Sequence, residues 1–91
     1  MIPANKVTDS QLIERFAAEW IPGESRAVER FLAENPQAVE NAEVAVRLIY
    51  EDFCLRQESG CKVDVREMIE RFPQWRTNLE VVLDFHELVR Q

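Results

Sequence analysis

Residues 12–54 of the chain read LIERFAAEWIPGESRAVERFLAENPQAVENAEVAVRLIYEDFC, and residues 49–91 read IYEDFCLRQESGCKVDVREMIERFPQWRTNLEVVLDFHELVRQ. The two stretches align without a gap at an offset of 37 residues (49 − 12 = 37). Chance would give about two or three identities over such a length, so the alignment indicates an internal repeat. The nine identical pairs are Glu14/Glu51, Phe16/Phe53, Gly23/Gly60, Val28/Val65, Pro36/Pro73, Gln37/Gln74, Asn41/Asn78, Glu43/Glu80 and Val44/Val81.

The first copy predicts a helix, a turn and a shorter helix. Thr8 with Gln11 has the spacing of a capping box, and apolar residues then recur at helical intervals as far as Trp20. Pro22-Gly23 ends this helix, and Ser25 or a neighbour opens the short one. Asn35-Pro36 ends that short helix in turn.

A long helix is predicted from about residue 39 to residue 58, and Gly60 follows it as a C-terminal glycine. Asp64 with Glu67 predicts a second capping box and a short helix that ends at Phe72-Pro73. A third box, Thr77 with Glu80, predicts the start of the last helix.

These elements predict an all-α protein: a compact five-helix bundle built from two copies of a 37-residue unit that share the long central helix. We expect residues 1–91 to form a single helical domain, with repeat 1 at about 12–54 and repeat 2 at about 49–91. We expect that neither copy could bury its apolar face without the other.

Charge argues against two classes of partner. The chain carries 17 acidic and 11 basic side chains, a net charge of −6, and its basic residues are scattered among Asp and Glu. Binding to nucleic acid or to an anionic membrane normally needs a basic face. We therefore expect no nucleic-acid partner and no membrane. Residues 1–10 do not resemble a signal peptide, so a cytoplasmic location is expected.

Catalytic and metal-binding patterns are weak. Cys54 and Cys61 are seven residues apart rather than the two to four of a zinc knuckle, and His86 is the only imidazole. The carboxylates, such as Glu51-Asp52, are spread around the helices without a predicted cleft. We expect no enzyme activity, no catalytic residue, no metal and no cofactor.

Three residues are candidates for protein binding: Trp20, Trp75 and Arg76. Trp and Arg are enriched at interaction hot spots, although a domain this small also needs its aromatic residues for the core. The last helix carries more apolar residues than one helix face can bury, and part of this surface is expected to meet another chain or domain. These residues are Leu79, Val81, Val82, Leu83, Phe85, Leu88 and Val89.

The arrangement from about Phe16 to Val89 resembles a helical segment that precedes the catalytic domain in serine/threonine protein kinases of planctomycete-type bacteria. The matching residues are Trp20-Ile21-Pro22-Gly23, Val28 to Pro36, Leu55 to Gly60, Val65 to Pro73, and Trp75. Cys61 stands at a position that is usually acidic in the family, and Met68-Ile69 replaces an aromatic-Leu pair.

This resemblance implies a non-catalytic protein–protein interaction or regulatory module of bacterial kinase signalling. The expected partner is the module's own kinase domain or a signalling protein. The kinase motifs themselves are absent from the 91 residues. Two alternatives remain open: a self-associating adaptor that resembles a death fold, which would form homo-oligomers, and a small transcription regulator.

Overall fold

The computed structural model describes residues 8–90, and the side chains of all of these except residues 87, 89 and 90. This part of the chain is all-helical, without a strand, as predicted from the sequence. Six α-helices and one turn of 3-10 helix follow one another: α1 (Asp9–Glu19), α2 (Ala27–Glu34), α3 (Pro36–Val39), α4 (Ala42–Glu58), α5 (Val65–Arg71), η1 (Pro73–Trp75) and α6 (Arg76–Arg90).

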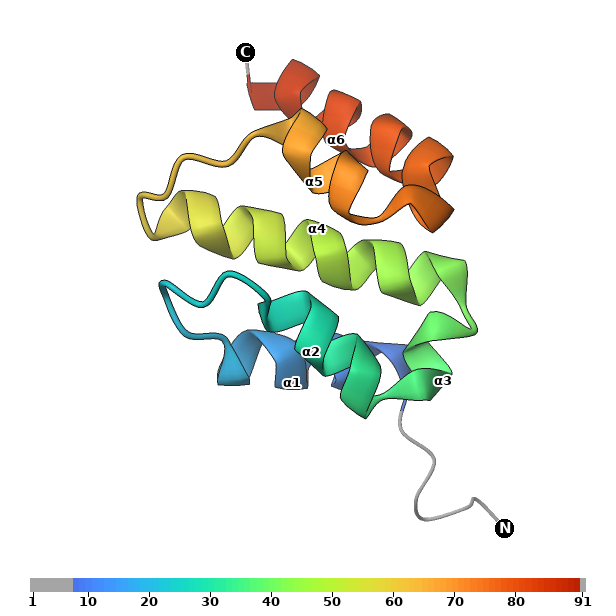
Figure 1. Cartoon of the computed structure of the whole chain (residues 1–91). Helices are drawn as coiled ribbons and strands as arrows, with labels where there is room; N and C mark the ends of the chain where they lie inside the picture. The colour runs from blue at the N-terminus through green and yellow to red at the C-terminus, as the bar shows by residue number, and fades with distance from the viewer. Residues whose placement is uncertain (1–7, 91) are drawn as a thin grey trace, which may run out of the picture.

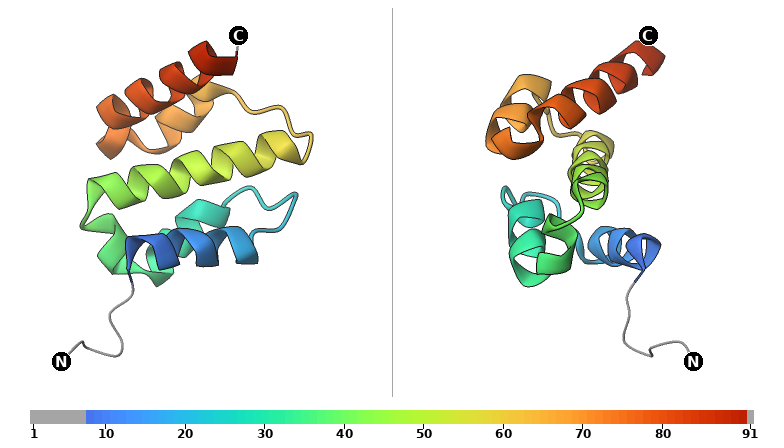
Figure 2. Two further views of the ribbon diagram at one scale, coloured as in Figure 1. Left: turned by 180° about the vertical axis from the view of Figure 1, so that it is seen from behind. Right: turned by 90° about the vertical axis from the view of Figure 1, so that its right-hand side faces the viewer.

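Helix α4 runs through the middle of the molecule (Figure 1). Helices α1, α2 and α3 lie on one side of it, and α5, η1 and α6 lie on the other, as the turned views also show (Figure 2). The helices before α4 pack on it, α6 packs on it from the opposite side, and α5 packs on α6. The first and last helices are therefore outer elements with one packed side each.

One continuous hydrophobic cluster joins the two sides. Helix α4 supplies more of it than any other helix, because helices cover it from both directions, and Leu48 and Ile49 are completely buried. Phe16 and Phe31 meet edge to face on the α1–α2 side, with ring centroids 5.3 Å apart. Leu79 and Leu83 of α6 are fully buried on the other side.

The predicted capping box of Thr8 and Gln11 is confirmed and is complete at the start of α1. Asp64 caps α5, although through the Arg66 N–H and not in a reciprocal box with Glu67. At the end of α4, the Gly60 N–H donates to Gln57 O and the Cys61 N–H donates to Arg56 O. This pair of bonds is a Schellman motif, and the positive φ of Gly60, +89°, lets the chain turn away.

The two short helices end before Pro36 and Pro73 as predicted, but the turns that begin at these prolines were not predicted. Pro36 and Pro73 were expected only to end the short helices, but each is also the first residue of a new turn, α3 and η1. A proline fits there because its fixed φ suits a helix start and its missing N–H would have no partner. As a result residues 8–90 contain six α-helices rather than five, and α4 begins after Asn41, whose side chain accepts from Glu43 N–H.

The predicted capping box Thr77/Glu80 is wrong for the same reason. The turn η1 leads directly into α6, whose first residue, Arg76, already has helical angles (φ −52°, ψ −50°). Thr77 therefore lies inside α6, and a cap, which needs an extended backbone, has no place at that position.

Several local geometries recur 37 residues apart. Gly23 and Gly60 have φ of +92° and +89°. Asn35 and Phe72, which precede the two prolines, have φ/ψ of −130°/72° and −131°/66°. In both copies the carbonyl of this residue accepts a hydrogen bond from the N–H three residues later. The Ala38 N–H donates to Asn35 O at 2.9 Å, and the Trp75 N–H donates to Phe72 O at 3.1 Å.

Candidate protein-binding surface

The outer face of α6 carries an exposed apolar ridge made of Val81, Phe85 and Leu88, which we call the α6 ridge. Their exposed fractions are 68%, 65% and 70%. The spacing i, i+4, i+7 places all three on one side of the helix, opposite the buried Leu79 and Leu83. Val89, which the sequence also assigned to this excess of apolar residues, has a side chain outside the described part of the structure.

A groove of about 600 Å³ runs between α5 and α6 beside this ridge. Its α6 wall is formed by Arg76, Glu80 and Asp84, whose spacing of four residues aligns them along the helix. Glu80 and Asp84 directly precede Val81 and Phe85, so they lie about 100° away around the helix. The groove and the ridge are therefore neighbouring parts of one surface.

The groove is polar with a small apolar part. Four carboxylates and two guanidinium groups line it, together with Val65, Ile69 and Pro73. Arg76 Nε lies 3.3 Å from Glu80 Oε1, and both side chains are largely exposed. Among the side chains that the structure describes, Glu70 of α5 and Asp84 of α6 have no ion-pair partner within 4 Å. The groove thus has an excess of negative charge on both walls.

The three binding candidates from the sequence lie in three different environments. Trp20 is half-buried at the end of α1, and its Nε1–H donates to Asp52 Oδ1 at 3.0 Å. Trp75 is buried in η1, with its ring centroid 6.2 Å from that of Phe72. Arg76 is exposed and belongs to the groove wall. The fold therefore brings only Arg76 to the surface described above.

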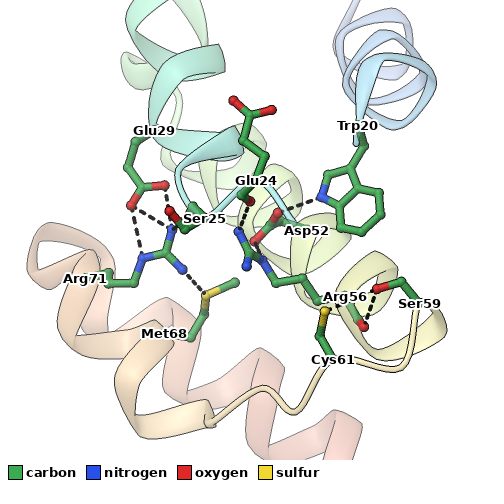
Figure 3. A network of polar contacts seen from close by, with 10 residues as sticks. All are labelled: Trp20, Glu24, Ser25, Glu29, Asp52, Arg56, Ser59, Cys61, Met68 and Arg71. Carbon is green, nitrogen blue, oxygen red and sulfur yellow. Dashed lines mark hydrogen bonds and ion pairs between the residues drawn. The ribbon is translucent and has the colours of Figure 1, made fainter. Parts of the chain in front are cut away.

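Trp20 belongs to a polar network at one end of α4 (Figure 3). Its partner Asp52 is completely buried and also accepts a 2.7 Å bond from Arg56 Nε. Arg56 continues to Glu24 O at 2.8 Å, in the turn between α1 and α2. No buried side-chain polar atom among the described residues lacks a hydrogen-bond partner, and these bonds position α4 against the turn between α1 and α2.

A second arginine joins the two sides of the molecule in the same view (Figure 3). Arg71 of α5 binds Glu29 of α2 through both carboxylate oxygens, at 2.6 and 2.7 Å from Nη2, and its Nε reaches the same carboxylate at 3.0 Å. Its Nη2 also donates to Ser25 O at 3.0 Å. These charge-assisted bonds connect residues 42 positions apart and hold α5 against the first half.

The only histidine bridges α4 and α6. His86 Nδ1 lies 2.6 Å from Tyr50 Oη, and Nε2 lies 3.0 Å from Gln57 Oε1. With the proton on Nε2, the ring donates to Gln57 and accepts from the tyrosine hydroxyl. Burial raises the pKa of Tyr50 above its ordinary 10.0, and a hydrogen bond with Cys54, the charge of Cys54 and that of Glu51 raise it further. This arrangement favours a neutral phenol that joins the two helices.

The described residues contain neither a metal-ligand cluster nor a membrane-spanning helix. No group of three or more His, Cys, Asp or Glu side chains there has the geometry to hold a metal ion. No helix in that part of the chain is long and apolar enough to cross a membrane.

Sequence reasoning found the ridge but missed the groove. Apolar residues in excess on one helix are visible in the sequence, whereas the groove needs α5 and α6 side by side. The spacing of four residues between Arg76, Glu80 and Asp84 is a local signal that could have indicated the α6 wall of the groove.

The chain was compared with models of known protein families, with curated protein sequences and with solved structures, and no match was found.

Proposed function

We propose that the chain is a non-catalytic protein-binding module whose partner packs on the α6 ridge. The observation that carries this proposal is the exposure of Val81, Phe85 and Leu88 on one face of a helix whose other face is fully buried. Contiguous apolar residues on a helix surface cost free energy in water, and covering them with another protein recovers it.

We further infer that the protein consists of two copies of a 37-residue unit, residues 12–54 and 49–91, that share α4. The paired glycine angles, the paired angles before the two prolines and the matching turn bonds support this inference. In this repeat α6 is the counterpart of α4, so its faces are built from equivalent positions.

The repeat indicates what kind of surface covers the ridge. Val81 and Phe85 correspond to Val44 and Leu48 of α4 (44 + 37 = 81, 48 + 37 = 85). Val44 and Leu48 are 2% and 0% exposed, because α4 has helices on both sides. The same positions on α6 lack a second layer. A partner that supplies a helix would complete the packing that α4 already has, and a single amphipathic helix on an apolar face is a common recognition mode.

The resemblance to kinase-associated helical segments gives this proposal a setting: bacterial serine/threonine kinase signalling, in the cytoplasm, with the partner either a kinase domain or another signalling protein. In this role the module docks a partner or restrains a catalytic domain and itself performs no chemistry.

Selection of helical ligands from an unbiased display library, with the whole chain as bait, tests the proposal. Ligands are expected that lose binding to Phe85→Gln, which removes the centre of the ridge without adding charge. They should retain binding to Ile21→Gln, which changes a 59% exposed apolar residue in the turn after α1. If no ligand depends on Phe85, or if Ile21→Gln has the same effect, the proposal is wrong.

A self-associating adaptor would use the same ridge, but the charge of the chain and the size of the ridge argue against it. Two copies would bring two chains of net charge −6 together through three side chains each. A stable dimer buries roughly 800 Å² per partner, which is more than three such side chains supply. Sedimentation equilibrium decides between them, since the adaptor forms dimers that Phe85→Gln dissociates.

A small transcription regulator has less support, because five arginines of the described chain are paired with carboxylates.

A further inference from the structure

We propose that the partner of this surface is a basic amphipathic helix: one apolar stripe that packs on the α6 ridge, and lysine or arginine side chains along one edge that enter the groove between α5 and α6. This inference rests on the proposed function and specifies the chemistry of the partner.

The position of the charges supports a basic edge. The groove carries Asp64, Glu70, Glu80 and Asp84 against Arg66 and Arg76, a formal difference of two negative charges (4 − 2 = 2). Arg76 is already engaged with Glu80. The carboxylates of Glu70 and Asp84 lie on opposite walls without ion-pair partners among the described side chains. A cation placed along the groove is attracted by both walls.

The geometry of the ridge selects a helix rather than an extended strand. Val81, Phe85 and Leu88 cover two turns of α6, and the groove wall runs parallel to them through Arg76, Glu80 and Asp84. Glu80 and Asp84 each lie one residue before an apolar residue of the ridge, and this arrangement matches a helix whose apolar and basic residues occupy adjacent faces. The side chains of an extended strand alternate between two opposite sides. A strand therefore could not contact the α6 ridge and the α6 wall of the groove at the same time.

The negative charge of the groove also determines which helices bind. Like charges placed face to face raise the free energy of a complex, so an acidic helix is rejected by the same carboxylates that attract a basic one. The same carboxylates repel the anionic headgroups of a membrane, even though the acyl chains below the headgroups are apolar. The ridge supplies affinity for any apolar stripe, and the groove selects among partners by charge.

The test uses the whole chain and four synthetic 18-residue peptides, with binding followed by fluorescence anisotropy at low salt. The first peptide is an amphipathic helix with leucines at i, i+3, i+4 and i+7 and lysines along one edge. Glutamine replaces the lysines in the second and glutamate in the third. The fourth has the composition of the first in scrambled order, so it has no apolar stripe.

We expect the basic helix to bind at least tenfold more tightly than the neutral helix, and the acidic and scrambled peptides to bind more weakly than both. The double variant Glu70→Lys/Asp84→Lys should reverse the preference so that the acidic helix binds best. The matched control Glu14→Lys/Glu40→Lys changes net charge equally at two exposed sites in the first half of the chain, and it should keep the original order.

Each other outcome has a definite meaning. Equal binding of the basic, neutral and acidic helices, lost in Phe85→Gln, overturns the charge selection and leaves the proposed function standing. Equal binding of the basic and scrambled peptides, or binding that Phe85→Gln does not weaken, overturns the inference as nonspecific attraction between charges. No binding of any helix overturns the inference together with the proposed function.

Discussion

At the scale of single residues, Asp52 holds the most consequential position. It is completely buried, yet it accepts hydrogen bonds from both Trp20 and Arg56. A buried carboxylate is tolerated only when donors surround it, and removal of either side of such a pair leaves an unpaired polar group. The sequence did not reveal this role, because Trp20 lies 32 residues away from Asp52 and only folding brings the two together.

Asp52→Ala is expected to lower the free energy of unfolding by about 3 kcal/mol, because Arg56 and Trp20 lose their shared acceptor in a buried site. Asp52→Asn should cost less, about 1–2 kcal/mol, since the amide oxygen can still accept one bond. Chemical denaturation measures both. Glu58→Ala, at an exposed site on the same helix, is the control and should change stability by less than about 0.5 kcal/mol. Equal effects of Asp52→Ala and Glu58→Ala would contradict the structural role of Asp52.

Tyr50 provides a test of burial along α4. Its pKa is raised above 10.0, chiefly by burial. The folded chain therefore holds the phenolic proton more tightly than the unfolded chain. The stabilisation is fully present below pH 10.0 and is lost as the pH rises through the pKa of the folded state. Tyr50 is the only tyrosine, so tyrosinate absorbance reports it directly. The titration midpoint should exceed that of the same chain in denaturant, and equal midpoints would contradict the burial of Tyr50.

At the scale of elements, α6 has two faces with opposite consequences for mutation. Leu83 is fully buried, whereas Phe85, two residues later, is 65% exposed. The periodicity of α6 was predicted from the sequence, but its first turn was not. The reason is physical: a proline can end one helix and begin the next, and Pro73 does both through η1. Pro36 and α3 repeat this arrangement.

Leu83→Ala is expected to destabilise the chain by about 2–4 kcal/mol, because it opens a cavity in the core. Phe85→Gln should change the free energy of unfolding by less than about 1 kcal/mol, because its ring lies mostly in water already. Urea denaturation of the two variants gives both values. If Phe85→Gln destabilised the monomer as strongly as Leu83→Ala, the residue would belong to the core and the α6 ridge would not be a free surface.

At the scale of the whole molecule, the two sides of α4 are joined by polar contacts as well as by the core. Arg71 reaches across from α5 to Glu29 of α2, and Arg56 reaches from α4 to the turn after α1. The all-helical class, the long central helix and the apolar residues of the core were predictable from periodicity. These long-range arginine contacts were not, because the sequence contains no signal that selects Glu29 from among 17 acidic residues.

A double-mutant cycle of Arg71→Ala and Glu29→Ala should give a coupling energy of about 1 kcal/mol, since the pair is bidentate and half-buried. The comparison cycle uses Arg15 and Glu19, whose closest atoms are 3.9 Å apart on the exposed face of α1. That cycle should give close to zero, as exposed pairs usually do. A coupling for Arg71–Glu29 no larger than for Arg15–Glu19 would show that the pair does not hold the two sides together.

The proposed binding surface lies on α6 and in the groove beside it, and nuclear magnetic resonance can locate a bound helix there. The ¹⁵N-labelled chain is titrated with the basic amphipathic helix, and amide shifts are followed residue by residue. We expect changes concentrated in α5 and α6, around Ile69, Asp84 and Phe85, with α1 and α2 unaffected. Changes spread over α1 and α2, or no change at millimolar peptide, would contradict this expectation.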